Sequence, residues 1–175
     1  FDIQSRELLE LTHVSPIPKP KQDNKIFELI QKSEIFKIKL EEYKNLGITK
    51  VIIEEPLLNS NNIYTVQTLL RYNSFVTKQI YDTLGIVPDF ISTYNSRKFA
   101  FPELVKENDK GKFVLFGGMP KDIDKKMIIW EKVAKKEPQI NWVYTKNNTL
   151  KKENFDMSDA YCCVLGYMKQ QEIWK

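Results

Sequence analysis

Four carboxylates in this sequence stand at positions where they could carry chemistry. Glu54 and Glu55 follow a β-branched apolar run and precede a proline, whereas Asp156 and Asp159 open the last apolar segment. Residues three apart share one face of a helix, so the two aspartates are expected to point the same way. Clustered carboxylates repel one another unless a cation neutralises them, and Mg²⁺ takes oxygen ligands while keeping water positions open for a phosphate substrate. The pattern predicts a divalent-metal nuclease.

Each pair of carboxylates also has an explanation that needs no function. Glu54 and Glu55 would be the solvated tip of a strand. Asp156 would be the N-cap of the last helix, where the helix dipole tolerates an acidic residue. Capping does not account for Asp159, the second aspartate before a strongly apolar helix. The nuclease interpretation accounts for both aspartates.

The segments that must position these carboxylates predict an α/β fold. The apolar run at 51–53 predicts a strand buried on both faces, which Pro56 ends because proline cannot donate to a ladder. The carboxylates then lie at the carboxyl end of the strand, where ligands gather in open α/β sheets. A hairpin turn is expected before residue 7 and a loop over 106–112. Strands are expected over 7–14 and 87–93, a short apolar segment lies at 113–116, and helices are expected over 23–46, 63–84 and 122–136.

Composition indicates one globular domain over residues 1–175. The 42% hydrophobic and 29% charged content is ordinary for a soluble protein, and no apolar run approaches the length of a membrane span. We therefore expect a cytoplasmic protein. The adjacent Cys162 and Cys163 lie in an apolar segment and are expected to be buried thiols without a disulfide. The net charge of +4 is compatible with a polyanionic partner.

The order of these motifs resembles RuvC-type Holliday junction resolvases of the RNase H-like nuclease superfamily, especially phage and bacterial members. The resemblance rests on the strand end Ile53-Glu54, a following helix, a strand that ends before Tyr94, and the D-x-x-D-A pattern from Asp156 to Ala160. It implies a mixed sheet of about five strands flanked by helices, a homodimer, and a bacterial or phage-infected host cell. It also implies two Mg²⁺ or Mn²⁺ ions and symmetric nicking of four-way DNA junctions.

The resemblance assigns roles to individual residues. Glu54, Asp156 and Asp159 match the family's carboxylate ligands, whereas Glu55 has no catalytic counterpart. The helix over 63–84 matches the dimerisation element. The residues that the resemblance places near DNA are Asn61, Asn62, Arg97, Lys98, Lys121, Lys125 and Lys126.

The sequence departs from the family at its first strand, which carries an essential aspartate in RuvC-type resolvases. Asp2 is not a match, because it precedes the predicted hairpin turn and is therefore assigned to the end of the second strand. Either the first strand is missing from this sequence, or the protein lacks that ligand and is inactive. We expect the former, because a sheet without its central strand would expose unpaired backbone groups and apolar side chains.

Two other functions stay open. One is a related nuclease that acts on RNA–DNA hybrids or branched replication forks. The other is a non-catalytic nucleic-acid-binding relative that keeps the fold. A dinucleotide-binding enzyme is disfavoured, because Gly117-Gly118 is not part of a G-x-G-x-x-G motif after a strand.

Overall fold

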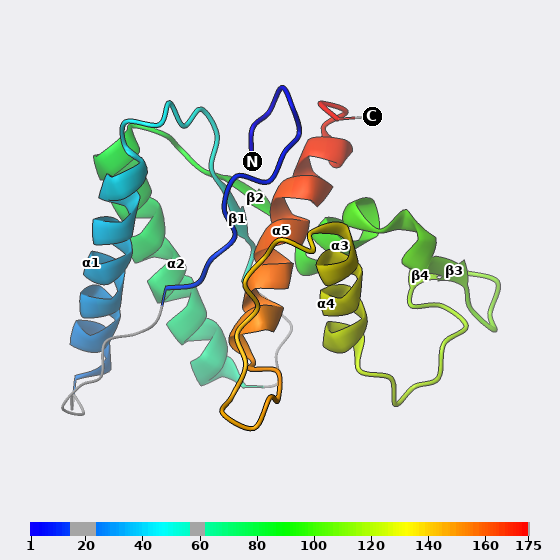
Figure 1. Cartoon of the computed structure of the whole chain (residues 1–175). Helices are drawn as coiled ribbons and strands as arrows, with labels where there is room; N and C mark the ends of the chain where they lie inside the picture. Colours follow the sequence, from blue (N-terminus) through cyan, green and yellow to red (C-terminus); the bar gives the residue numbers. More distant parts are fainter. Residues whose placement is uncertain (15–23, 57–61, 175) are drawn as a thin grey trace. The chain divides into compact units, whose positions relative to one another are not determined.

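The computed structural model describes residues 1–14, 24–56 and 62–174, and the chain divides into two compact units. One unit comprises Val14–Phe90, and the other comprises Phe1–His13 together with Ile91–Lys175 (Figure 1). The described residues form five α-helices, one 3-10 helix and two two-stranded sheets, which confirms a mixed α/β protein. The single nuclease domain over residues 1–175 stays a prediction.

The 14–90 unit contains the helices α1 (Lys25–Tyr43) and α2 (Ile63–Leu84) and the strand β1 (Ile52–Glu54). Both helices match the predicted segments and begin at an asparagine N-cap, Asn24 for α1 and Asn62 for α2. Gly85 ends α2 with a φ of +70°, a left-handed conformation that glycine adopts without strain. The two helices pack together, and Gln79 Nε2 donates to Glu34 Oε1 at 2.7 Å.

Strand β1 pairs with β2 (Asp89–Ile91), which lies within the segment predicted as a strand. The Asp89 N–H donates to the Val51 carbonyl at 2.8 Å, and Lys50 Nζ lies 2.8 Å from Asp89 Oδ2. The prediction that β1 is buried on both faces is wrong, since all three of its residues are only half-buried. Within the described part of the chain, β1 belongs to a sheet of two strands, which cannot cover a strand as a wide sheet does.

The other unit is built around the helix α5 (Glu153–Gln170), which carries ten buried residues. The helices α3 (Thr93–Ala100) and α4 (Lys125–Lys136) both pack against α5. A Cβ on Gly166 would lie 2.3 Å from the Ser96 carbonyl oxygen, so only glycine permits the backbones of α3 and α5 to come this close. Cys162 and Cys163 are buried thiols on α5 that are not joined in a disulfide, as predicted.

The first residues of the chain join this unit through its C-terminal end. Trp174 Nε1 donates to the Ile3 carbonyl at 3.0 Å, and the Phe1 ring lies 5.3 Å from the ring of Tyr161 and 5.5 Å from that of Trp174. The predicted turn before residue 7 is present, with the Asp2 N–H donating to the Glu7 carbonyl at 2.9 Å. The strand predicted over 7–14 and the assignment of Asp2 to a strand end are wrong, because neither segment joins a sheet.

The loop predicted over 106–112 is confirmed for residues 108–112, which form the turn of a β-hairpin, whereas Lys106 and Glu107 belong to its first strand. The strands β3 (Val105–Glu107) and β4 (Phe113–Leu115) pair antiparallel, with Lys106 opposite Val114. The Asn108 side chain holds the turn by accepting the N–H groups of Lys110 and Lys112, both at 3.0 Å. The 3-10 helix η1 (Pro102–Leu104) connects α3 to this hairpin.

The five-stranded central sheet implied by the resemblance is not seen in residues 1–14, 24–56 and 62–174. Short strands account for the difference, because each of the four has only three residues. Among the described helices, none is both long enough and apolar enough to cross a membrane.

Candidate functional site

Glu54 is the last residue of β1, as expected for a strand-end carboxylate. Its side chain is half-buried, and its backbone carbonyl accepts a long hydrogen bond of 3.4 Å from Asn73 Nδ2 on α2. Glu55 is exposed. The two glutamates therefore differ in burial, with Glu54 half-buried and Glu55 exposed.

Asp156 and Asp159 lie in the first two turns of α5, but Asp156 is not the N-cap of this helix. The helix begins three residues before Asp156, at Glu153, and the capping position is Lys152, whose side chain makes no capping bond. Asp156 is exposed within the first turn, where its negative charge interacts favourably with the positive end of the helix dipole. The capping prediction is wrong because backbone bonds from Asn154 and Phe155 to the turn at 151–152 start the helix earlier.

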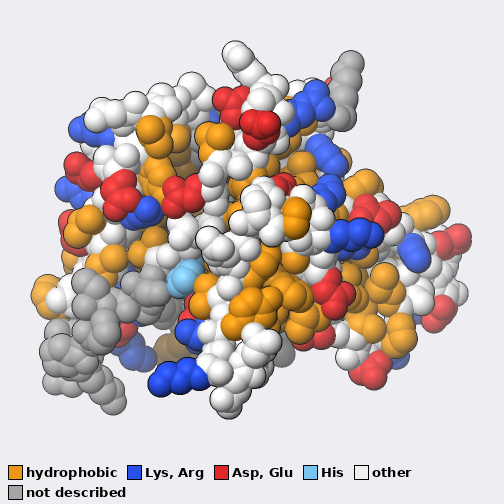
Figure 2. All heavy atoms as spheres, in the orientation of Figure 1, with side chains coloured by type: hydrophobic (Ala, Val, Ile, Leu, Met, Phe, Trp, Pro, Cys, Tyr) orange, Lys and Arg blue, Asp and Glu red, His pale blue; other side chains and the backbone are white. Residues whose placement is uncertain are grey.

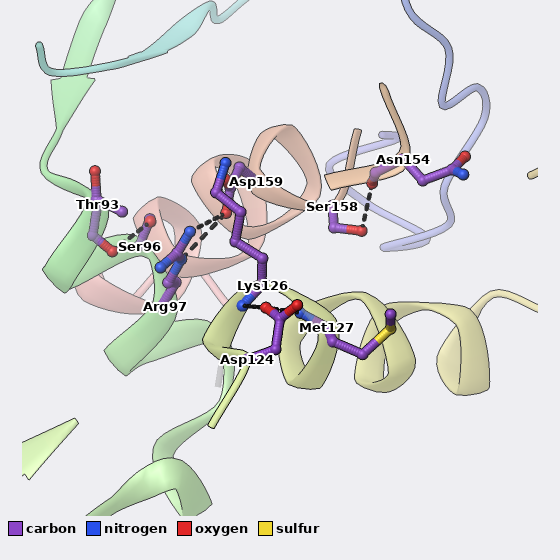
Figure 3. A network of polar contacts seen from close by, with 9 residues as sticks. All are labelled: Thr93, Ser96, Arg97, Asp124, Lys126, Met127, Asn154, Ser158 and Asp159. Atoms are coloured by element: carbon purple, nitrogen blue, oxygen red, sulfur yellow. Dashed lines mark hydrogen bonds and ion pairs between the residues drawn. The ribbon is translucent and has the colours of Figure 1, made fainter. Parts of the chain in front are cut away.

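Asp159 forms an ion pair with Arg97, a residue predicted to contact phosphate. Arg97 donates to Asp159 Oδ1 from Nη2 at 2.7 Å and from Nε at 3.1 Å (Figure 3). The two side chains are only 12% and 16% exposed, so water screens the pair weakly. Arg97 lies on α3, whose N-cap is the Ser92 hydroxyl, next to the close contact between Ser96 and Gly166. The packing of α3 on α5 thus fixes this pair.

Asn154 anchors the start of α5 and was missed by the sequence analysis. Its side chain is fully buried, accepts the Val143 N–H at 2.8 Å, and donates to the carbonyls of Val143 and Lys151 at 2.7 and 3.0 Å. The Ser158 hydroxyl donates to the Asn154 carbonyl at 2.8 Å (Figure 3). Asn154, Ser158 and Cys162 follow one another at intervals of four residues and so share one face of the helix. This spacing on an apolar helix was the available sign that Asn154 is buried.

The predicted phosphate-contacting lysines lie at the surface of the same unit. The Lys98 ammonium lies 5.3 Å from the centre of the Phe99 ring, and that of Lys125 lies 5.9 Å from the centre of the Phe116 ring. Lys121, Lys125 and Lys126 are exposed. Asp124 caps α4 by accepting the N–H groups of Lys126 and Met127 (Figure 3).

The two predicted asparagine contacts belong to the 14–90 unit. Asn61 lies outside the described residues. Asn62 Oδ1 accepts the N–H groups of Tyr64 and Thr65 at 3.1 and 3.2 Å, so this side chain has a structural role as the N-cap of α2.

The charges on one face of the molecule are mixed in sign. On the face drawn in Figure 2, basic and acidic side chains alternate over short distances. A face of this kind does not produce a broad positive field that would attract a polyanion.

The donor chemistry of the three predicted ligands fits Mg²⁺ or Mn²⁺, which prefer oxygen. Within the described ranges, no group of three or more Asp, Glu, His and Cys side chains is assembled to hold a metal. Asp156 and Asp159 supply two carboxylates from one helix, and one oxygen of Asp159 is already bonded to Arg97. Glu54 belongs to the other unit. The prediction of a metal ion is therefore supported only by the type of oxygen donors that these three residues offer.

A groove of about 320 Å³ lies in the 14–90 unit and contains none of the predicted site residues. Its lining is mostly apolar and comes from the segment before α1 and from both helices: Val14, Leu29, Lys32, Ile35, Thr68, Leu69 and Tyr72. Phosphodiester chemistry needs charged groups, and among the described residues of this lining Lys32 alone carries a charge.

Comparisons of the chain with protein-family models, with curated proteins and with solved structures found no match.

Proposed function

We propose that the chain is a structure-selective DNA endonuclease of the RuvC type, which resolves four-way junctions by metal-dependent hydrolysis of phosphodiester bonds. The observation that supports this proposal is the element on which each carboxylate lies. Glu54 ends the strand β1, and Asp156 and Asp159 occupy the first turns of α5. These are the kinds of element to which the resemblance assigns the metal ligands.

Glu54, Asp156 and Asp159 would hold Mg²⁺ or Mn²⁺ ions, which supply an activated hydroxide and stabilise the leaving 3′ oxygen when bound. Arg97 fixes the orientation of the Asp159 carboxylate before any ion binds. The pair engages Nε and Nη2 of the guanidinium, so the donors on Nη1 remain to bind a phosphate oxygen. Arg97 would thus join one carboxylate ligand to the DNA backbone.

A homodimer is part of this proposal, with α2 as the contact element. The exposed apolar side chains of α2 support it, since Ile63 is 63% and Tyr64 78% exposed. Exposed apolar residues gathered on one element indicate an interaction surface rather than a folded core. Two copies would present two sites to the symmetric strands of a junction.

Cleavage of a labelled four-way junction with Mg²⁺ tests the proposal, using the full-length protein. We expect Glu54→Gln to abolish cleavage, because the amide removes the negative charge that binds the ion. Glu55→Gln is the matched control, since it makes the same chemical change at the exposed neighbouring residue and should leave cleavage intact. Chelation of the metal should stop the reaction. No cutting by the wild type, or equal activity of Glu54→Gln and wild type, would refute the proposal.

The ion pair between Arg97 and Asp159 favours a second candidate, a non-catalytic nucleic-acid-binding relative. In such a protein the Asp159 carboxylate has a structural role, and Arg97 balances its negative charge in place of a metal ion. That protein would bind junctions in the presence of a chelator, with a strong salt dependence, and would not turn them over. Comparing junctions with RNA–DNA hybrids and forks in the cleavage assay separates the remaining nuclease substrates.

A further inference from the structure

Two lysines and one glutamate gather near the buried ring of Phe101 in the unit that contains α5. Lys132 and Lys136 are one turn apart on α4, and their ammonium groups lie 5.7 and 5.2 Å from the centre of the Phe101 ring. Lys132 Nζ also donates to Glu103 Oε1 at 2.6 Å. The ring and the ion pair thus hold two long lysine side chains over one small surface.

Lys169, in the last turn of α5, lies within electrostatic range of Lys136 and Glu103. Burial lowers the pKa of Lys169, and the positive charge of Lys136 lowers it further, whereas Glu103 acts in the opposite direction. Lys136 and Lys169 therefore repel each other across a partly desolvated surface. Glu103 already forms an ion pair with Lys132. Its single negative charge therefore cannot neutralise the positive charges of Lys136 and Lys169 as well.

We propose that Lys132, Lys136 and Lys169 form a binding site for a phosphate group of a nucleic-acid backbone. A phosphate placed between Lys136 and Lys169 would accept a charge-assisted hydrogen bond from each and remove their repulsion. Because Phe101 and Glu103 already restrain the lysine side chains, binding loses less side-chain entropy than at two freely rotating lysines. The proposal rests on the proposed function for the identity of the ligand, a nucleic acid.

This site is separate from the predicted catalytic carboxylates. Lys169 follows Asp159 by ten residues on α5, which corresponds to about 15 Å along the helix axis. It also differs from the lysines that the resemblance places near DNA, which lie on α3 and around the start of α4. A backbone contact at this distance would hold a DNA arm several nucleotides away from the cut phosphate.

Salt-dependent binding of a fluorescent four-way junction, measured by anisotropy with EDTA present, tests the site without any metal. The site variant is Lys136→Gln/Lys169→Gln. The matched control is Lys110→Gln/Lys146→Gln, which removes the same charge from two exposed residues in turns. We expect the site variant to lower the slope of log Kobs against log salt by about 1 to 2, and the control to leave it at the wild-type value. Lys136→Arg/Lys169→Arg should restore most of the slope.

Thermal unfolding of each variant shows that a lost slope does not reflect a lost fold. Equal slopes for the site variant and the control, with both folded, would overturn the site. Junction cleavage is scored separately with Mg²⁺. No cleavage together with a lowered slope in the site variant would overturn the proposed function and leave the site standing. A wild type that binds neither junction, duplex nor single-stranded DNA would overturn both.

Discussion

Asp159 Oδ1 accepts two hydrogen bonds from Arg97, one from Nη2 at 2.7 Å and one from Nε at 3.1 Å. The residues are 62 positions apart in sequence, and the packing of α3 on α5 brings them together. The pair joins a predicted metal ligand to a predicted phosphate contact. Its energetics and its role in cleavage can therefore be measured on the same side chains.

Removing one partner of this pair should destabilise the protein more than removing both. Arg97→Ala leaves a carboxylate that is only 16% exposed without its counter-ion, and we expect a loss of about 1–3 kcal/mol in the free energy of unfolding. Arg97→Ala/Asp159→Ala should recover part of this loss. Urea unfolding of both single variants and the double variant gives the coupling energy. Arg71→Ala, an exposed arginine on α2, is the control, and additive effects at Arg97 and Asp159 would contradict the prediction.

Asn154 should be among the residues most sensitive to substitution in this unit. Asn154→Ala removes the partners of the Val143 N–H and carbonyl groups and leaves a small cavity, so we expect a loss of about 2–4 kcal/mol. Asn154→Asp should also destabilise, because a carboxylate cannot donate to the carbonyls of Val143 and Lys151. Hydrogen exchange at the Val143 amide measures the effect locally. Asn147→Ala, at an exposed position, is the matched control.

Tyr161 should make the folded protein less stable at alkaline pH. Burial and the hydrogen bond that its hydroxyl donates to Glu137 raise the pKa of Tyr161 above the ordinary value of 10.0. The folded state therefore keeps the proton that the unfolded state loses. This contribution is complete below pH 10 and decreases above it, by at most about 1.4 kcal/mol per pH unit.

Urea unfolding of Tyr161→Phe between pH 9 and pH 11 tests this dependence, and the range is chosen around the ordinary tyrosine pKa of about 10. We expect the variant to lose part of the slope. Burial also raises the pKa of Tyr72, so a second alkaline contribution remains. Tyr64→Phe removes a hydroxyl from a side chain that is 78% exposed and should leave the slope unchanged. A slope in Tyr161→Phe equal to that of the wild type would rule out this role.

Asn62 offers a way to separate a structural role from a DNA contact. Asn62→Ala removes the N-cap of α2 and should lower the free energy of unfolding by about 1 kcal/mol. Asn62→Ser keeps a capping oxygen and should recover most of this loss. If Asn62 acts only as a cap, the serine variant will bind the junction as well as the wild type does. Weakened binding in a stable serine variant would instead identify a direct contact.

Local sequence signals predicted the helices better than the strands. Asn24, Asn62 and Gly85 lie at helix ends, and the capping chemistry of such residues acts within a few residues, so a local pattern is enough to predict a helix. Strands depend on partners far away in sequence, so the prediction over 7–14 failed and the charged β3 was missed. The number of strands in the sheet could not be derived from residues alone.

The sequence predicted the element on which each candidate residue lies, but not the contacts that these residues make. Sequence spacing identified Glu54, Asp156 and Asp159 as carboxylates on a strand end and a helix start. It could not reveal that Arg97 bonds Asp159, because the helices that carry these residues are distant in sequence and come together only in the folded packing of α3 on α5. Asn154 was missed for a related reason, since its partner Val143 lies in an irregular segment without periodicity.

The division of the chain sets an order in which its parts can fold during synthesis. The 14–90 unit is one continuous segment, whereas the other unit needs residues 1–13 together with residues from 91 onward. Domains fold as units while the chain leaves the ribosome, so the 14–90 unit can form while Phe1 and Ile3 still lack the ring and indole that they contact in the finished protein. The first residues must wait for Tyr161 and Trp174. The acid–base pair on α3 and α5 consequently forms among the last parts of the molecule.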